Sequence, residues 1–583
     1  MLLVLTGWTG WLVAKASAIR SEISAAISLI TQMKSELAAS DEKSAQRTAR
    51  EVRSHTAAAR EAADDPLWTL TSNLPFIGAN IGAVSEVARS ADDVAGLSLV
   101  PLMDVWGSLH WDTVLPTRSG SDLAPLKAAS PTVKSAAYAV RVSTERLSAI
   151  DKSRLLPQVA KPLADATEQL QEITGALNVA AAASTIAPGM LGADGARNYL
   201  LIVQNNAESR SSGGIPGALA VLNLDAGKLT LGAQNSASGL GVMSPVIPVD
   251  PQQKQIYSGR LGKFIQDVNL TPDFPTAAAT AQAMWEQRMG QRVDGVISID
   301  PVALSYILDA TGPVTVNSPE LAVLPISGLP TELNAGNVVS TLLSDVYSQV
   351  EQPELQDAYF AAVAKQVFDA LGNGKSEPTA LMDGLSRATE EGRILVWSRN
   401  ENEQAVLGQY ALSGAIAGPS VLPAQFGVYF NDGTGAKMDY YVKRTVQLIK
   451  ECPRDGYEQT TVRVTSTNTV RHDAADVLPT YVTGDGSFNV PPGSVQTNIV
   501  AYGPSQAYVE TAKVDGQGTE FAPYLHGNRP VGVYAVRLAP GESKTVEFTF
   551  GKIVQHTEPY VFVTPTVQPV DDVKLPTLTA SCG

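Results

Sequence analysis

The chain has 583 residues, roughly three to four times the length of an average domain, so we expect several domains. Hydrophobic residues make up 44% and charged residues 17% of it, values that are typical of globular proteins and exclude a wholly disordered chain. The formal net charge of -15 disfavours nucleic acid as a partner, because phosphate backbones bind basic surfaces. The five histidines and two cysteines form no paired ligand motif, so no zinc or thiol-held metal site is expected.

The first segment, residues 1–14, carries no charge. It is shorter than the roughly 20 apolar residues that a spanning helix needs, and it lacks the basic start of a signal peptide. We interpret it as part of a transmembrane segment whose upstream half is missing, with Trp8 and Trp11 toward its outer end. A buried helix end is the alternative.

Residues 15–190 have the pattern of a helical stalk or subdomain. Apolar residues recur every three or four positions in two stripes, first at Ile19, Ile23, Ile27, Ile30, Met33 and Leu37, then at Leu155, Val159, Leu163, Ala166, Leu170, Ile173 and Leu177. Pro66 ends the first helical stretch, and Pro188 with Gly189 closes the second. Ordinary packing within the chain and self-association through these stripes both remain open.

Residues 196–415 alternate strand and helix patterns, which favours an α/β domain with a parallel or mixed sheet. A polar, glycine-rich loop is expected at 205–217, after the first strand. The other expected elements are strands at 199–203, 293–299 and 393–398, a hairpin turning at 225–227, and helices at 275–289, 301–311, 338–350 and 355–371.

The expected loop contains a candidate phosphate site. Arg210 offers a planar fork of donors, and Gly213 and Gly214 let backbone N–H groups approach an anion. The alternative is a tight turn in which Arg210 pairs with Glu208. The sequence leaves both interpretations open.

Helix 275–289 carries further candidates at its two ends. Asn269 and Asp273 lie in the loop that enters it, where an anion, a sugar hydroxyl or a divalent cation are all compatible with the residues, and where Asp273 also fits a helix cap. Arg288 and Arg292 lie at the other end, where cations also complement the helix dipole.

Residues 420–583 are rich in β-forming runs separated by Gly, Pro, Asp and Asn, which predicts a β-sandwich of immunoglobulin-like texture. Cys452 lies near its start and Cys582 near its end. In an exported protein these two can form one disulfide, and two free thiols are the alternative. The whole chain is thus expected to be a multi-domain α+β protein.

Four ordered blocks carry a resemblance to a known family. They are NYLLIVQNNAESRSSGGIPG, NLTPDFPTAAATAQAMWEQ, VDGVISIDPVALSYILDATGPV and EGRILVWS. Together they resemble the domain-of-unknown-function family numbered four thousand and twelve, found in surface proteins of Gram-positive bacteria. Its usual NxxExRxxGG form is filled here by Asn205 or Asn206, Glu208, Arg210, Gly213 and Gly214. The resemblance implies a cell-envelope protein.

A looser resemblance, through the arginine-containing loop and the strand–helix unit 293–314, extends to the LytR-CpsA-Psr enzymes, which move a glycopolymer from a polyprenyl pyrophosphate carrier to the cell wall. It implies a LytR-CpsA-Psr-like central domain. On this hypothesis Arg210, Asp273 and Arg288 are catalytic, and Mg²⁺ is held mainly through the phosphates. The candidate ligand-binding residues are Asn206, Glu208, Gly213, Gly214, Asn269 and Arg292.

Two functions follow for a single-pass membrane protein with its bulk outside the cell. The first is an enzyme acting on a polyprenyl-phosphate-linked glycopolymer. The second is a non-catalytic module that binds glycan or lipid phosphate, or that assembles other surface proteins. The enzyme requires Arg210, Arg288, Arg292 and the loop at 269–275 to line one cleft.

Overall fold

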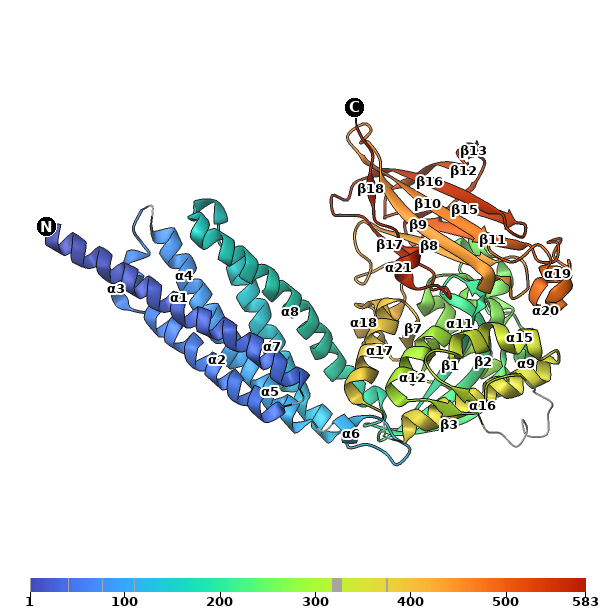
Figure 1. Cartoon of the computed structure of the whole chain (residues 1–583), viewed down its shortest axis with the longest axis horizontal. Coiled ribbons are helices and arrows are strands. Elements are labelled where there is room, and N and C mark those ends of the chain that lie inside the picture. Colours follow the sequence, from blue (N-terminus) through green and yellow to red (C-terminus); the bar gives the residue numbers. More distant parts are fainter. Residues whose placement is uncertain are drawn as a thin grey trace. The chain divides into compact units, whose positions relative to one another are not determined.

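The computed structural model of the chain describes residues 2–39, 41–75, 77–109, 111–316, 328–373 and 376–582. They form a mixed α+β protein with a helical N-terminal region and strand-rich C-terminal sheets (Figure 1). Two compact units are present, one of residues 1–115 and 121–195, the other of residues 116–120 and 196–583. Residues 196–415 and 420–583, which the sequence analysis treats as separate domains, therefore lie in one compact unit.

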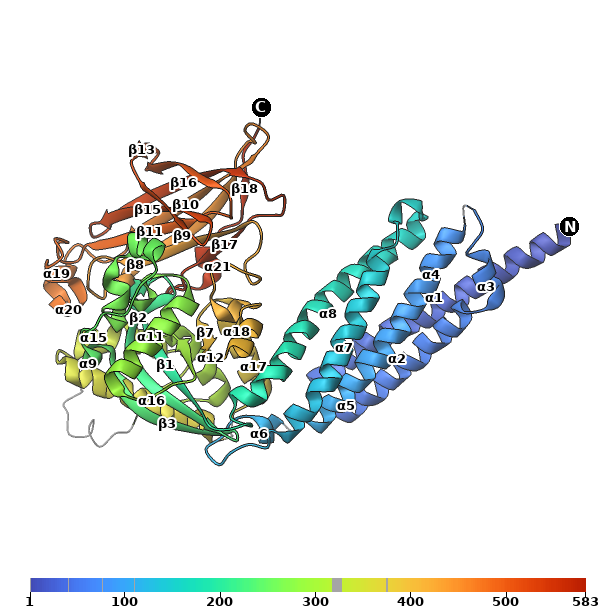
Figure 2. The ribbon, with the colours of Figure 1, turned by 180° about the vertical axis from the view of Figure 1, so that it is seen from behind.

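The first unit is built from helices that run alongside one another (Figure 2). They are α1 (Leu2–Ala38), α2 (Glu42–Ala63), α3 (Pro66–Thr71), α4 (Gly78–Val94), the π-helical turn η1 (Ala95–Leu99), α5 (Val100–Ser108), α6 (Trp111–Val114), α7 (Ala124–Ser148), the turn η2 (Lys152–Arg154) and α8 (Pro157–Met190). Small side chains such as Ala45, Ala49 and Ala136 are fully buried between them, so the helices approach closely.

The first predicted stripe is only partly the buried face of α1. Ile19 and Met33 are buried together with Ala26, whereas Ile27 and Ile30 are exposed. α1 packs chiefly against α2, which presents alanines, so the contact face is narrower than the apolar stripe. The predicted end of the second stripe is also shifted, because α8 continues through Pro188 and Gly189 to Met190.

Within the described ranges, one helix is long and apolar enough by length and composition to cross a membrane. This helix is α8, and 11% of its most apolar window is buried inside the structure. Residues 2–14, for which the sequence predicts a membrane segment, form the uncharged start of α1. That prediction stays a prediction.

The second unit contains a five-stranded sheet in the order β3-β2-β1-β4-β7, in which β1 and β4 are parallel and the other pairs antiparallel. The strands are β1 (Arg197–Arg210), β2 (Gly213–Asp225), β3 (Lys228–Ser236), β4 (Gly295–Ile299) and β7 (Ile394–Ser398). The sheet is therefore mixed. β2 and β3 confirm the expected hairpin, but its turn has two residues, Ala226 and Gly227, both at positive φ, and not the three expected at 225–227, because Asp225 pairs with Lys228.

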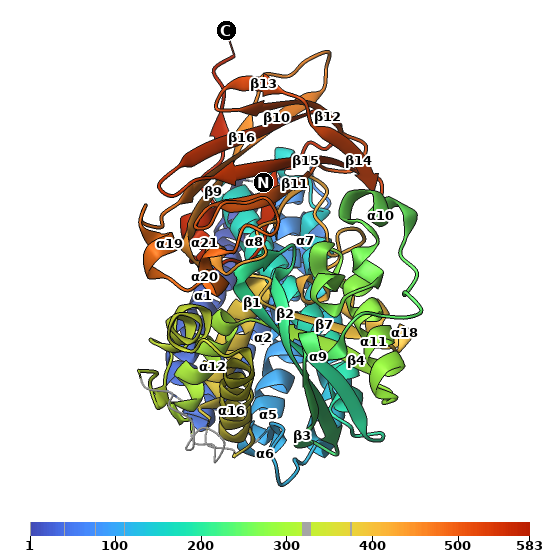
Figure 3. The same cartoon turned by 90° about the vertical axis from the view of Figure 1, so that its right-hand side faces the viewer.

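Helices cover both faces of this sheet, as Figure 3 shows, with α11 on one side and α12 and α16 on the other. The α11 face holds Trp285, fully buried beside Leu200 and Val296. The helices and short strands of this part are α9 (Ala237–Leu240), α10 (Pro251–Tyr257), η3 (Gly259–Gly262), η4 (Ile265–Leu270), α11 (Phe274–Met289), α12 (Pro301–Thr311), β5 (Val314–Thr315), β6 (Glu332–Leu333), α14 (Val338–Ser340), η5 (Thr341–Asp345), α15 (Val346–Gln349), α16 (Pro353–Gly372), α17 (Pro378–Glu390), α18 (Glu401–Leu407) and η6 (Ala411–Ser413).

Two further sheets make up the C-terminal region, in the orders β13-β12-β16-β10-β9-β18 and β14-β15-β11-β8-β17. Both contribute to one hydrophobic core, for example Phe430 and Ile499 from one sheet and Phe548 from the other. The strands are β8 (Gln425–Asp432), β9 (Val442–Lys450), β10 (Glu458–Asn468), β11 (Val495–Tyr502), β12 (Tyr508–Val514), β13 (Gln517–Thr519), β14 (Ala522–His526), β15 (Arg529–Leu538), β16 (Ser543–Ile553), β17 (Tyr560–Val563) and β18 (Leu578–Thr579).

Short helices connect these strands: η7 (Met438–Tyr441), α19 (Ala474–Val477), α20 (Thr480–Thr483) and α21 (Val570–Val573). Cys452 and Cys582 form a disulfide in the structure. It closes a separation of 130 residues and ties the last described residues to the segment after β9.

Candidate functional site

The predicted loop at 205–217 is instead the tip of the long β1–β2 hairpin, and it is buried. Polar groups of the C-terminal region hold this tip. The Ser209 N–H donates to Asp439 Oδ2 (2.8 Å), and the Ser211 N–H donates to Asn431 Oδ1 (2.9 Å). The Thr564 hydroxyl donates to the Ser211 carbonyl (2.9 Å). Residues more than 200 positions away thus extend the strand.

Gly213 and Gly214 serve this close packing. Gly213 has φ +137°, and a Cβ there would lie 2.4 Å from Gln204 Oε1. A Cβ on Gly214 would lie 2.1 Å from the carbonyl carbon of Asn205. The Gly214 N–H, predicted to face an anion, donates to Gln204 Oε1 at 2.7 Å. This donor is already used within the fold.

Arg210 is buried, with 7% of its side chain exposed. Its Nη2 lies 3.0 Å from Glu208 Oε1 and 3.5 Å from Asp267 Oδ1, and its Nη1 donates to the Ser209 carbonyl. Burial opposes the charged form, but the Glu208 and Asp267 carboxylates raise the pKa of the guanidinium. The arrangement is the ion pair with Glu208 that the sequence left as the alternative to a phosphate clamp.

The second oxygen of Glu208 meets Lys437. Oε2 lies 2.8 Å from Lys437 Nζ, and this ammonium lies over the rings of Tyr347 and Tyr481, 5.6 and 5.8 Å from their centroids. Burial favours the neutral acid, yet Lys437 and Arg210 together lower the pKa of Glu208. Asn205 also joins this cluster, since its side-chain amide donates to the Tyr347 hydroxyl.

Asp432, at the end of β8, is the acid of this cluster with a raised pKa. Its carboxylate accepts the N–H groups of Thr434 (2.9 Å) and Gly435 (2.7 Å). Burial, together with the negative charges of Asp439 and Glu208, raises its pKa to about 7. Asp439 is itself paired with the buried Arg444.

A second arm of the network begins at Asn206. Its amide donates to Asp300 Oδ2 (3.0 Å) and to the carbonyl of Pro565 (3.2 Å). Arg393, fully buried, donates to the same Asp300 oxygen (2.9 Å) and to the carbonyl of Thr566 (3.0 Å). We refer to the Glu208 cluster and this arm together as the buried ion-pair network.

The candidates near α11 are held in separate places. Asn269 is buried, and its amide donates to the Gly214 carbonyl (2.8 Å), so it supports the hairpin tip. Asp273, before α11, accepts from the Thr276 hydroxyl (2.5 Å) and from the N–H of Ile416 (3.4 Å). Of these two, only Asn269 contacts the hairpin directly.

Arg288 and Arg292 are exposed at the far end of α11. The 16 residues of this helix span about 24 Å, so Arg288 lies about 22 Å along the helix axis from Asp273. Arg288 donates to the carbonyl of Val242 (2.6 Å). Arg210 is buried whereas these two arginines face solvent, so the one cleft that the enzyme hypothesis requires is not formed by these residues.

The network offers no ready place for a metal ion. Among the described residues, no group of three or more His, Cys, Asp and Glu side chains could hold one. Glu208 and Asp439 are engaged by cations, and the carboxylate of Asp432 by backbone N–H groups. A Mg²⁺ ion carried in by the phosphates of a ligand stays a prediction.

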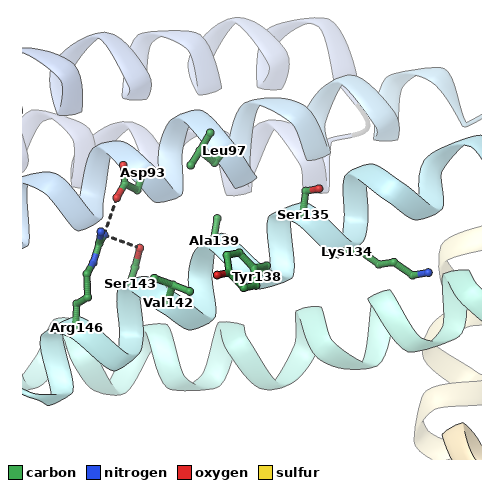
Figure 4. Close-up of a pocket in the computed structure, with 9 residues that line it drawn as sticks. All are labelled: Asp93, Leu97, Lys134, Ser135, Tyr138, Ala139, Val142, Ser143 and Arg146. Carbon is green, nitrogen blue, oxygen red and sulfur yellow. Dashed lines mark hydrogen bonds and ion pairs between the residues drawn. The ribbon is translucent and has the colours of Figure 1, made fainter.

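A cavity of about 450 Å³ lies in the first unit (Figure 4). Leu97 of η1 and Tyr138 of α7 line it, with Lys134 at one end and Arg146 at the other. Arg146 is paired with Asp93 (2.6 Å). The volume is within the range of small-ligand pockets, and the lining is mostly apolar without a convergent set of catalytic groups.

Sequence reasoning missed Lys437, Arg444, Arg393 and Asp432. One signal was available for Arg444, because Val442, Arg444 and Val446 are spaced by two residues and therefore share the inward face of β9. A charged residue at an inward position of a strand indicates a buried partner. The other three carry no comparable local signal.

Comparison with known families shows that residues 194–347 match the model described as "Protein of unknown function (DUF4012)". This confirms the family resemblance predicted from the sequence. Three of the four quoted blocks lie within the match, and EGRILVWS lies beyond it. A search of curated proteins finds no match.

Two solved structures are similar to parts of the chain. One is protein gbs0355 from Streptococcus agalactiae, with 14% identity, a TM-score of 0.26, and coverage of 39% of this chain and 76% of that one. The other is a protein described as nutrient-binding, lpg2210 from Legionella pneumophila, with 7% identity, a TM-score of 0.14, and coverage of 22% and 44%. Neither TM-score supports an argument about this fold.

Proposed function

We propose that this chain is a membrane-associated protein of the cell envelope, with its bulk outside the cytoplasm, and that it acts as a non-catalytic scaffold or binding module. The observation that carries the proposal is the burial of Arg210 in an ion-pair network. A phosphate clamp needs donors that a ligand can reach, whereas Arg210 is buried with both Nη atoms bonded to the protein, and only its Nε, also buried, has no partner. The partners of the chain would be a glycan or other surface proteins.

Three features support the location. The disulfide between Cys452 and Cys582 uses both cysteines of the chain and suits an oxidising compartment. The apolar composition of α8 and the uncharged residues 2–14 support membrane association. The DUF4012 match is to the family whose resemblance, in the sequence analysis, implies a cell-envelope protein.

On this proposal, the second unit presents its outer surfaces to binding partners. The two C-terminal sheets, which we interpret as a β-sandwich, and the five-stranded sheet are joined by the network into one compact body. Such a body holds its outer surfaces in fixed positions relative to one another. Rigidity of this kind suits a module that positions partners, because each buried contact opposes relative movement.

Calorimetry with a short polyprenyl pyrophosphate tests the proposal against the transferase hypothesis. We expect no saturable heat with the wild-type chain, with or without Mg²⁺. The variant Arg288→Ala is the matched control, because this exposed side chain is removed without disturbing the core. Saturable binding by the wild type that Arg288→Ala abolishes would overturn the scaffold proposal.

A separate experiment tests the proposed location outside the cytoplasm. Protein isolated from its native cells is treated with an alkylating reagent with and without reductant, and its mass is measured. We expect no alkylation of Cys452 or Cys582 until the disulfide is reduced. Two thiols that react without reductant would contradict an oxidising compartment.

A further inference from the structure

An apolar surface lies on α3 and the connection that follows it. Leu67, Leu70, Leu74 and Ile77 are all exposed, and their spacing of three or four residues repeats along the segment. We call these four side chains the α3 patch. Residues 66–85 contain no charged side chain, so the patch lies within an uncharged surface segment. Contiguous exposed apolar side chains mark interaction surfaces in soluble proteins.

The patch is fixed in place by buried contacts on its other side. Trp68 is buried, belongs to one hydrophobic cluster with Trp11 and Leu12 of α1, and donates from Nε1 to the Ser85 hydroxyl (2.9 Å). Asp65 accepts from the Leu67 N–H and pairs with Lys15 (3.0 Å). Figures 1 and 2 show α3 lying beside α1. The leucines are therefore exposed on an ordered element.

The position of α3 along α1 indicates what covers the patch. Asp65, directly before α3, pairs with Lys15, where the uncharged segment 2–14 of α1 ends, and Trp68 of α3 shares its cluster with Trp11, Leu12, Ile19 and Ile23 of α1. A bilayer that receives the segment 2–14 has its interface at this level, where Trp and Lys side chains are favoured.

The nearby charges are compatible with an anionic lipid surface. The Leu156 N–H donates to Asn80 Oδ1 (2.8 Å), which ties the α7–α8 connection to the start of α4 beside Ile77. This connection carries Lys152 and Arg154. Arg154 pairs with Asp151, and Lys152 has no ion-pair partner within the described ranges. The connection thus has a net positive charge on a chain whose formal charge is -15.

We propose that the α3 patch inserts into the interfacial region of a lipid bilayer, beside the segment 2–14, as a second and in-plane membrane contact. The inference rests on the membrane association in the proposed function. Leucine side chains that enter the headgroup boundary leave water, which stabilises the bound orientation. Two contacts on one helical unit also restrict how this unit can tilt on the membrane.

The test uses the full chain reconstituted with vesicles of equal parts phosphatidylcholine and phosphatidylglycerol. Leu70→Cys carries an environment-sensitive dye, because Leu70 is 68% exposed and the native cysteines are joined in the disulfide. Ile27→Cys is the matched control. Ile27 is 59% exposed and lies about 18 Å along α1 from Lys15, on the side away from the segment 2–14.

We expect vesicle flotation of both labelled proteins, with a blue shift and quenching by nitroxide lipids only for the dye at position 70. Flotation with a dye at position 70 that stays in water would overturn the inference and leave the proposed membrane association standing. Failure of the wild-type chain to float would overturn both. Equal shifts at both positions would overturn the inference, because they indicate non-specific adsorption.

Discussion

The two units of this protein differ in how deeply their most buried ion pairs lie. In the helical unit, pairs such as Arg89–Asp64 lie at the surface, with both side chains 42% exposed. In the second unit, Arg393–Asp300 and Arg444–Asp439 are almost completely buried. Buried pairs depend on their partners because an unpaired charge in the interior is costly, whereas exposed pairs are solvated with or without their partner. Removal of a single charged side chain should therefore lower the free energy of unfolding more in the second unit than in the helical unit.

The largest effect is expected for Arg393→Met. It leaves the buried Asp300 without its cation, while Glu391 keeps Arg387, and we expect a loss of about 3–5 kcal/mol in the free energy of unfolding of the second unit. Urea denaturation followed by far-UV circular dichroism measures it. Adding Asp300→Asn to this variant should recover part of the loss. A loss below about 1 kcal/mol would contradict the role of the network.

An intermediate effect is expected for Asp432→Asn. The pKa of Asp432 is raised from 3.8 to about 7, so the folded state binds its proton more tightly than the unfolded state. Its contribution to stability is fully present below about pH 4 and is lost as the pH rises toward 7 and above. Asparagine loses one of the two backbone N–H bonds at every pH, but the variant's free energy of unfolding relative to wild type should rise by about 1 kcal/mol between pH 5 and pH 8.

The same denaturation experiment, repeated from pH 5 to pH 8, checks this. The stability of Asp432→Asn relative to wild type should fall as the pH falls, because the wild-type carboxyl then becomes neutral as well. A relative stability that stays constant with pH would show that the substitution acts through packing and not through charge.

The smallest effect is expected in the helical unit. Arg89→Ala removes an exposed ion pair with Asp64, and we expect a change within about 0.5 kcal/mol. Thermal unfolding in low and high salt measures this change. High salt screens the exposed ion pair, so we expect it to remove the difference in stability between Arg89→Ala and wild type. A loss comparable to that of Arg393→Met would mean that the two units do not differ in the proposed way.

Elements with local signals were predictable. Asp300 followed by Pro301 predicts a helix start, and in the structure the Asp300 carboxylate accepts the N–H of Ala303 (2.8 Å). The turn at Asp225–Gly227 and the helix ended by Gly312 were also found from neighbouring residues. The expected loop at 205–217 was wrong, because the strand is extended by contacts with Asn431 and Asp439, far along the chain.

For the candidate site, the sequence identified the residue types but not their surroundings. Arg210 and Glu208 were both singled out, and a guanidinium near a carboxylate is compatible with a ligand site or with an internal pair. Lys437 and Asp267 decide between the two, because they complete the neutralisation of the pair inside the fold. Neither neighbour follows from any periodicity of the chain.

By itself, the sequence determined the helical N-terminal region, a central sheet that alternates with helices, the strand-rich C-terminal region and the resemblance to DUF4012, since these depend on periodicity, turn residues and ordered motifs. Only the tertiary structure decided that Arg210 is buried and that Arg288 is exposed at the far end of a helix. The physical reason is that burial and charge pairing depend on which distant segments come together. Local residue patterns do not specify those contacts.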